Sequence, residues 1–160
     1  MSKPNVVEGK RPGLKAGQAT ELTIIAPFNK GGAERLRKKM SDTFGDPNQK
    51  LVDRLGTIHD VRYVIFDNDT RLLFTSTFDG EWDPYIDDFA TKIPDQIDMI
   101  FGEVDGFPGI RSPGIKDWIV KHQVSAQYFY SAYPSSSVRD VWKALKVKGG
   151  LDTLLDQASS

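Results

Sequence analysis

The stretch VRYVIFDNDTRLLFTSTF, residues 61–78, decides the fold. Two runs rich in β-branched and aromatic residues flank DNDT at residues 67–70. Asn and Asp tolerate left-handed backbone and form local hydrogen bonds, so the stretch predicts a β-hairpin. In the return strand apolar side chains fall on both faces, since Phe74 and Phe78 alternate with Leu73. We therefore expect both faces of the hairpin to be covered.

The hairpin lies within an alternating series of predicted strands and helices. A short apolar run before it predicts a buried strand, and apolar residues at helical spacing predict a helix between that strand and the hairpin. A second helix follows the hairpin. A loop and short helix at residues 103–123 then precede an aromatic-rich strand at 124–133. Ser137 caps a final helix, which Gly149 and Gly150 separate from a short amphipathic tail.

Without the inserted loop and helix, the predicted order is β-α-β-β-α-β, which is the order of the ferredoxin-like fold. We therefore predict a single α+β domain over residues 20–160, with helices on one face of the sheet and a C-terminal helix. Residues 1–19 are predicted to form a mobile or surface-draped arm. The other face of such a sheet needs a partner, and no internal repeat supplies one. The simplest cover is a second subunit, so we predict a homodimer.

Composition excludes several kinds of site. The 160 residues carry a formal net charge of -1, which gives no general attraction for nucleic acid or anionic membranes. The chain contains no cysteine, which excludes thiolate nucleophiles and is compatible with a cytoplasmic location. No apolar run is long enough to span a bilayer.

Five carboxylates near the second helix suggest a metal site, but their spacing does not follow a calcium loop. Acidic residues at a helix start are already explained by capping and by the helix dipole. We therefore predict no metal site at these residues: Asp79, Glu81, Asp83, Asp87 and Asp88.

The first candidate for chemistry is His59, which lies beside Asp60 and Arg62 at the start of the hairpin. A carboxylate can orient an imidazole as a general base, and a guanidinium can pair with a carboxylate or an enolate. We take these three residues as the candidate catalytic set. The structural alternative is a histidine at the sheet edge that bonds to a backbone carbonyl.

Aromatic side chains indicate a pocket for a small, largely apolar molecule, because such pockets combine aromatic walls with few polar groups. The alternative is that the aromatic residues fill the core and the dimer interface. The candidate ligand-binding residues lie on the hairpin, the short helix and the predicted last strand: Phe74, Phe78, Trp118, Tyr128 and Tyr130.

The element order over residues 20–147 resembles that of the dimeric α+β-barrel superfamily. The segments LLFTSTFDGEWDPYIDDF, DGFPG and YFYSAYP resemble uncharacterised bacterial members. The superfamily includes antibiotic-biosynthesis-type monooxygenases, chlorite dismutases and dye-decolourising peroxidases. The resemblance implies a ligand cavity and leaves the reaction open. Our first expectation is cofactor-independent oxygenation, isomerisation or cyclisation of an apolar or aromatic substrate. The alternative is a non-catalytic binding or assembly module whose pocket lacks any titratable group.

Haem-binding members of that superfamily supply a further alternative. In them a helix-borne histidine is the proximal iron ligand, which implies His122 here. The pattern GEVDG, residues 102–106, resembles the GxxDG of dye-decolourising peroxidases, where the aspartate lies on the distal side of the haem, and this implies Asp105. The structural alternative for His122 is a packed, hydrogen-bonded residue at a helix C-terminus. Apart from haem, we predict no cofactor.

Overall fold

The computed structural model describes residues 13–44 and 52–159. Its centre is a four-stranded antiparallel sheet in the order β1-β2-β4-β3. The strands are β1 (Lys15–Ala16), β2 (Ala19–Pro27), β3 (Ile58–Phe66) and β4 (Arg71–Asp79). In the described ranges a 3-10 turn at Val52–Arg54 accompanies five α-helices: α1 (Gly32–Phe44), α2 (Trp82–Lys92), α3 (Pro94–Phe101), α4 (Ile115–His122) and α5 (Val138–Ala158).

The predicted hairpin is confirmed as β3 and β4, which pair along almost their whole length. The turn between them contains Asp67, Asn68 and Asp69, all with positive φ angles of 56°, 51° and 65°. Asp and Asn adopt this left-handed conformation more readily than most residues, as the sequence predicts. The hydroxyl of Thr70 closes the turn by donating to the carbonyl oxygen of Asp67 at 2.7 Å.

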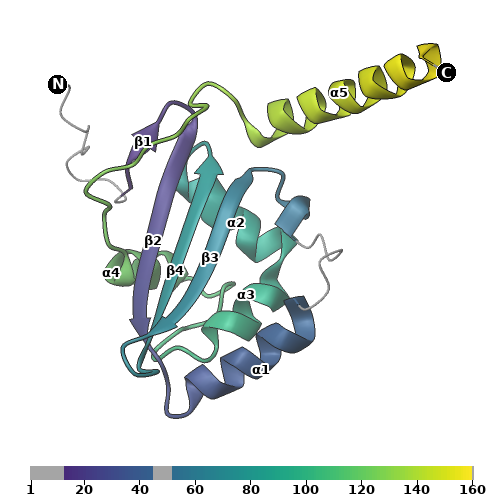
Figure 1. Cartoon of the computed structure of the whole chain (residues 1–160). Coiled ribbons are helices and arrows are strands. Elements are labelled where there is room, and N and C mark those ends of the chain that lie inside the picture. Colours follow the sequence, from purple (N-terminus) through teal and green to yellow (C-terminus); the bar gives the residue numbers. More distant parts are fainter. Residues whose placement is uncertain (1–12, 45–51, 160) are drawn as a thin grey trace.

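The α+β class is confirmed, and the helices α1, α2 and α3 lie on one side of the sheet (Figure 1). Alternate residues of β2 and β4 point towards these helices and form the core with them, among them Leu22, Phe74 and Phe78. The pairing of β2 with β4, and of β4 with β3, is consistent in general with a ferredoxin-like sheet.

The predicted strand at residues 124–133 does not form. Its start follows β2 only briefly, where the Val124 N–H donates to the Thr23 carbonyl at 2.9 Å. Farther along, the edge of β2 is already occupied, because β1 pairs with Ala19 and Thr20. The fourth strand therefore comes from residues within the predicted N-terminal arm, and residues 1–12 of that arm lie outside the described ranges.

The loop that carries GEVDG packs against the turn between β2 and α1. The Asn29 N–H donates to the Glu103 carbonyl at 2.9 Å, and a Cβ on Gly32 would lie only 2.5 Å from the same oxygen. The Glu103 carboxylate is buried and accepts hydrogen bonds from Arg35 Nε at 2.7 Å and from Lys39 Nζ. The motif therefore fixes the loop to α1.

We expect Glu103→Gln to lower the free energy of unfolding by about 1–2 kcal/mol at pH 7, because two cations lose their carboxylate partner. Burial alone would raise the pKa of Glu103, but the hydrogen bonds from Lys39 and Arg35 outweigh it and hold that pKa below its ordinary value of 4.5. The lowered pKa stabilises the fold above pH 4.5, and this contribution is lost as the pH falls through the lower native value. Urea unfolding of both proteins at pH 7 and pH 3 measures it. An equal difference between the two proteins at both pH values would contradict the prediction.

Helix α5 projects from the body of the protein (Figure 1), and Val138 is its one buried residue. It continues through Gly149 and Gly150, where the sequence predicts a separation between helix and tail. Nothing in the described ranges, α5 included, is a helix both long and apolar enough to cross a membrane.

Candidate functional site

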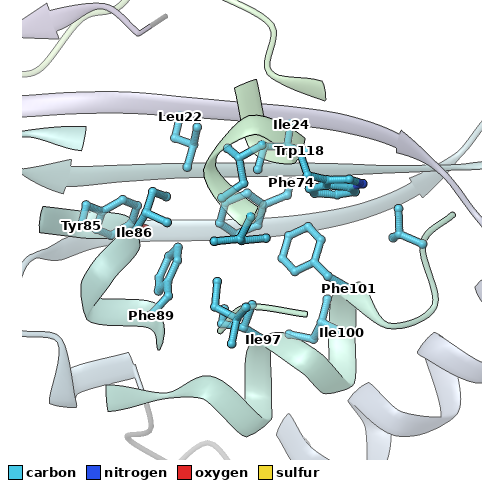
Figure 2. Packing of buried hydrophobic residues seen from close by; sticks show 14 of the residues in the cluster. Leu22, Ile24, Phe74, Tyr85, Ile86, Phe89, Ile97, Ile100, Phe101 and Trp118 are labelled. Atoms are coloured by element: carbon cyan, nitrogen blue, oxygen red, sulfur yellow. The ribbon is translucent and has the colours of Figure 1, made fainter. Parts of the chain in front are cut away.

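An apolar cavity lies between the sheet and the helices. Its volume is only about 10 Å³, roughly the space that one water molecule needs, so a ligand can enter only if the surrounding side chains move apart. Figure 2 shows the surrounding side chains from β2, β4, α2, α3 and α4. All the lining residues are aliphatic or aromatic, and the lining contains no titratable group.

The helices contribute to this cavity because their apolar residues recur at helical spacing. Ile86 and Phe89 face it from α2, and Ile115 and Ile119 face it from α4. The loop between α3 and α4 closes one side, since the Ile110 N–H donates to Asp98 Oδ1 at 2.7 Å. The cavity is therefore held by regular elements and one anchored loop.

The structure separates the five predicted ligand-binding residues. Phe74 and Trp118 line the cavity. Phe78 is fully buried elsewhere in the core, where its ring stacks on Tyr85 with the centroids 3.7 Å apart. Tyr128 and Tyr130 are exposed on the segment that does not form a strand. Phe78 therefore fills the core, as the alternative interpretation of the aromatic residues has it.

Tyr85 adds a polar group to the core that the sequence does not single out. Its hydroxyl lies 2.5 Å from Ser76 Oγ, so both hydroxyls have a buried partner. Burial raises the pKa of Tyr85 far above its ordinary value of 10.0, so the phenol stays protonated at physiological pH. Tyr85 is not among the residues that line the cavity, so we assign the pair a structural role.

Trp118 is the one residue in the cavity wall whose side chain contains a polar atom. Its ring contacts Phe107, with centroids 5.2 Å apart, and His122, with centroids 4.3 Å apart. Its indole Nε1 is buried and has no hydrogen-bond partner within the described part of the chain. A buried donor without a partner is uncommon and requires an explanation such as water or a ligand.

The two haem candidates have ordinary structural surroundings. His122 is partly buried at the end of α4, its Nδ1 lies 2.8 Å from the Trp118 carbonyl oxygen, and it does not line the cavity. The side chain of Asp105 is exposed. Neither side chain is presented to the cavity, so the residues present do not fit a haem site there.

His59 lies at a β-bulge, where the register of β3 against β4 shifts. Its Nε2 lies 2.7 Å from Asp79 Oδ1, so its partner is a carboxylate at the end of β4. The other carboxylate oxygen, Oδ2, accepts the Val138 N–H at 2.8 Å. Asp79 therefore joins the bulge to the first turn of α5.

The candidate catalytic residues lie on the sheet face opposite the cavity. Asp60 pairs with Thr77 and Arg62 pairs with Thr75, and these threonines alternate with the cavity-facing Phe74 along β4. Asp79 belongs to the same opposite face by the same alternation. The structure thus brings His59, Asp60 and Arg62 to one face without placing them in the cavity.

We expect Asp79→Ala to lower the free energy of unfolding by about 1–2 kcal/mol, because it removes a helix-start acceptor and the histidine partner together. Urea unfolding followed by circular dichroism measures this loss. Asp60→Ala is the matched control, since that neighbouring carboxylate is exposed. Equal losses in the two variants would show that Asp79 does not hold the root of α5.

The carboxylates near α2 are ion-paired. Lys116 of α4 lies 3.1 Å from Asp83 and 2.7 Å from Asp87, and Lys92 lies 2.8 Å from Asp88. Asp83 is in the first turn of α2 and is not its N-cap, which is Glu81. Across the described ranges, no group of three or more His, Asp or Glu residues could hold a metal ion.

Asp79 is the site residue that sequence reasoning assigns least well. The sequence places it among carboxylates beside a helix start, and its contact with His59 depends on the bulge that shifts the register. The cavity-lining isoleucines of α2, α3 and α4 were predictable as apolar helix positions but carry no chemical signature of their own.

Comparisons with protein-family models, with curated proteins and with solved structures find no match for this chain. A function can therefore be inferred only from the geometry of the described residues. Two surfaces are candidates: the apolar cavity under the helices, and the opposite, open face of the sheet with His59, Asp60 and Arg62.

Proposed function

We propose that this protein binds one small, largely apolar molecule in the cavity and does not transform it. The observation that supports the proposal is the wall itself, which has no titratable group. General acid–base chemistry needs a side chain that can hold or release a proton within hydrogen-bond reach of the substrate. The histidine, aspartate and arginine suggested by the sequence belong to the other face of the sheet.

The lining also restricts the chemistry of the ligand. A hydrocarbon wall stabilises a hydrocarbon ligand by removing it from water, at about 25 cal/mol per Å² of apolar area. The indole N–H of Trp118 is buried but does not open onto the cavity, so the wall offers a ligand no hydrogen-bond donor. A charged or polyhydroxylated molecule would lose its hydration without compensation. We therefore propose a small, largely apolar aromatic or aliphatic molecule.

Titration with toluene, followed by NMR of the three tryptophan indole N–H groups, tests this proposal. We expect the Trp118 signal to shift with saturation while the signal of exposed Trp142 stays unchanged. Ile97→Phe fills the cavity and is expected to weaken binding at least tenfold. Ile25→Phe, the same change on the open face of the sheet, is the control. Equal binding by both variants, or no shift at Trp118, would overturn the proposal.

We also propose the finer fold and assembly that the sequence predicts: a ferredoxin-like domain whose open sheet face is covered by a second subunit. The support is that α1, α2 and α3 cover one face of the sheet and leave the other without a helix (Figure 1). Light scattering at micromolar concentration is expected to give twice the chain mass of 17.9 kDa. A monomer would contradict this assembly and leave the ligand proposal untouched.

Catalysis at the open face is the second candidate, because the carboxylate of Asp79 lies 2.7 Å from the imidazole of His59 and can orient it. It would suit the cofactor-independent reactions that the sequence suggests, with Arg62 as an anion partner. Once a substrate is known, His59→Gln should abolish turnover and leave toluene binding unchanged. Full activity of that variant would remove the assignment.

Haem binding is the remaining alternative, and absorbance separates it from the others. We expect the protein to stay colourless after incubation with haem and removal of the excess, since neither His122 nor Asp105 faces the cavity. A retained Soret band that His122→Ala abolishes would overturn this expectation. The cysteine-free composition agrees with the cytoplasmic location that we propose.

A further inference from the structure

Helix α5 exposes large apolar side chains along its whole length. Trp142 is 44% exposed and Leu145 is 61% exposed, and three leucines near the end of the helix are similarly uncovered. A single exposed leucine needs no explanation, but a row of them on one projecting helix marks a surface that contacts something else. The remaining exposed members are Val141, Val147, Leu151, Leu154 and Leu155.

The exposed apolar residues of α5 form two stripes on different sides of the helix, and the second begins with Val147, just before the two glycines. At 100° per residue, the stripe through Trp142 and Leu145 and the stripe through Leu151 and Leu155 point roughly 140° apart. Gly149 and Gly150 lie between the two halves, and a Cβ on either would meet nothing within 4 Å. Glycine is therefore not required by packing here, although each glycine costs about 1 kcal/mol relative to alanine in a helix. Two glycines make this the easiest point for the helix to bend.

The first turn of α5 is firmly attached to the body. Ser137 and Asp140 form a reciprocal capping box, and Asp79 accepts the Val138 N–H at 2.8 Å. This root directs α5 away from its own sheet (Figure 1). The helix therefore cannot cover its own open sheet face without breaking these bonds.

The open sheet face is the other surface that no helix covers, and only its β2 edge is covered, where Glu21 accepts hydrogen bonds from the backbone N–H groups of Leu14 and Ala126. Val64 is 42% exposed there, and Ile25 and Leu73 are only partly buried. Asp60 and Arg62 are exposed on the same face without an ion-pair partner in the described ranges. The face thus combines an apolar strip with unpaired charges of both signs.

We propose that α5 of each copy covers the open sheet face of a second copy, bending at Gly149 and Gly150 so that both apolar stripes reach it. This rests on the homodimer proposed above and names the element that forms it. A second copy fits because each chain offers one arm and one open face, so a twofold axis satisfies both surfaces at once. Charge also fits: Lys146 is exposed and flanks the stripe through Trp142 and Leu145, so it can pair with the exposed Asp60 of the sheet face.

The dimensions are compatible with this arrangement. The part of α5 before the glycines, residues 138–148, is about 16 Å long, and strands of 9 residues are about 30 Å long. That part can therefore lie along about half of the sheet, and the part after the bend can extend over the remainder. Because both arms make the same contacts in opposite directions, the interface would be isologous, as a twofold dimer requires.

The cysteine-free chain allows a direct test by disulfide crosslinking. Leu145→Cys and Leu73→Cys are made as separate proteins, one with a mass tag, mixed and oxidised. We expect a crosslinked heterodimer in the mixture at several times the yield of either homodimer alone. Lys143→Cys, on the opposite side of the same helical turn, replaces Leu145→Cys as the control and should crosslink weakly. A dimer by light scattering without this crosslink would overturn the inference and leave the homodimer standing. A monomer would overturn both.

Charge insertion gives an independent readout in solution. Trp142→Asp combined with Leu145→Asp should raise the dimer dissociation constant at least a hundredfold, whereas Lys143→Asp should change it less than threefold. Mixing that double variant with Leu73→Asp restores one of the two interfaces and should recover part of the dimer. Failure of the mixture to recover any dimer would contradict reciprocal docking.

Gly149→Ala combined with Gly150→Ala tests the bend. The alanines fit sterically and favour a straight helix, so helix content should be kept while dimerisation weakens about tenfold or more. Unchanged dimerisation with higher helix content would show that α5 docks without bending and would overturn that part of the proposal.

Discussion

Replacing Phe74 with alanine is expected to lower the free energy of unfolding by about 3–5 kcal/mol. The ring is buried and contacts Tyr63 and Phe101, with centroids 5.2 Å and 5.5 Å away. It also lies on β4, which pairs with both β2 and β3, so the surrounding backbone has little freedom to collapse into the space. The loss therefore includes a cavity term in addition to the transfer of the ring.

Urea unfolding followed by circular dichroism measures the effect. Tyr128→Ala is the control, because it removes an aromatic ring that is 79% exposed and should change stability little. If the two variants lost similar stability, Phe74 would not be the central core residue that its burial indicates. If Phe74→Ala folds, its enlarged cavity should also bind aromatic molecules larger than toluene, which NMR titration with naphthalene would show.

The hairpin was predictable from sequence because its determinants are local. Turn-forming residues separate two runs of strand-forming residues, and no distant contact is needed to specify the turn. The buried face of β4 and the apolar stripe of α2 follow from periodicity in the same way, which is why Phe74 could be identified as a pocket residue.

The predicted strand at residues 124–133, which does not form, could not be judged from local sequence alone. Residues 124–133 have strand composition, but the outcome depended on which segment reached the edge of β2. The Glu21 N–H donates to the Leu14 carbonyl at 3.0 Å. The edge of β2 is therefore paired with a segment that lies more than a hundred residues before the predicted strand. Tyr128 and Tyr130 lie within residues 124–133, and for the same reason their side chains are exposed and do not line the pocket. The position of His59 was equally non-local, since the bulge in β3 determines its contact with Asp79.

The second large effect is expected at Trp118, where two substitutions should differ sharply. Trp118→Ala should lower the free energy of unfolding by about 3–5 kcal/mol, because the ring contacts Phe101 and Phe107 and is only 8% exposed. Trp118→Phe should cost less than about 1.5 kcal/mol. It keeps much of the aromatic contact and removes an indole N–H that has no partner in the described ranges.

Urea unfolding by circular dichroism compares the two variants, and toluene titration of Trp118→Phe by ligand-observed NMR connects them to function. A buried donor costs about 1–3 kcal/mol when it has no acceptor, so its removal offsets part of the lost ring volume. Since toluene has no hydrogen-bond acceptor, its affinity should stay within threefold of wild type in the phenylalanine variant. If Trp118→Phe were as destabilising as Trp118→Ala, the indole N–H would have a buried acceptor such as water, and its removal would offset nothing.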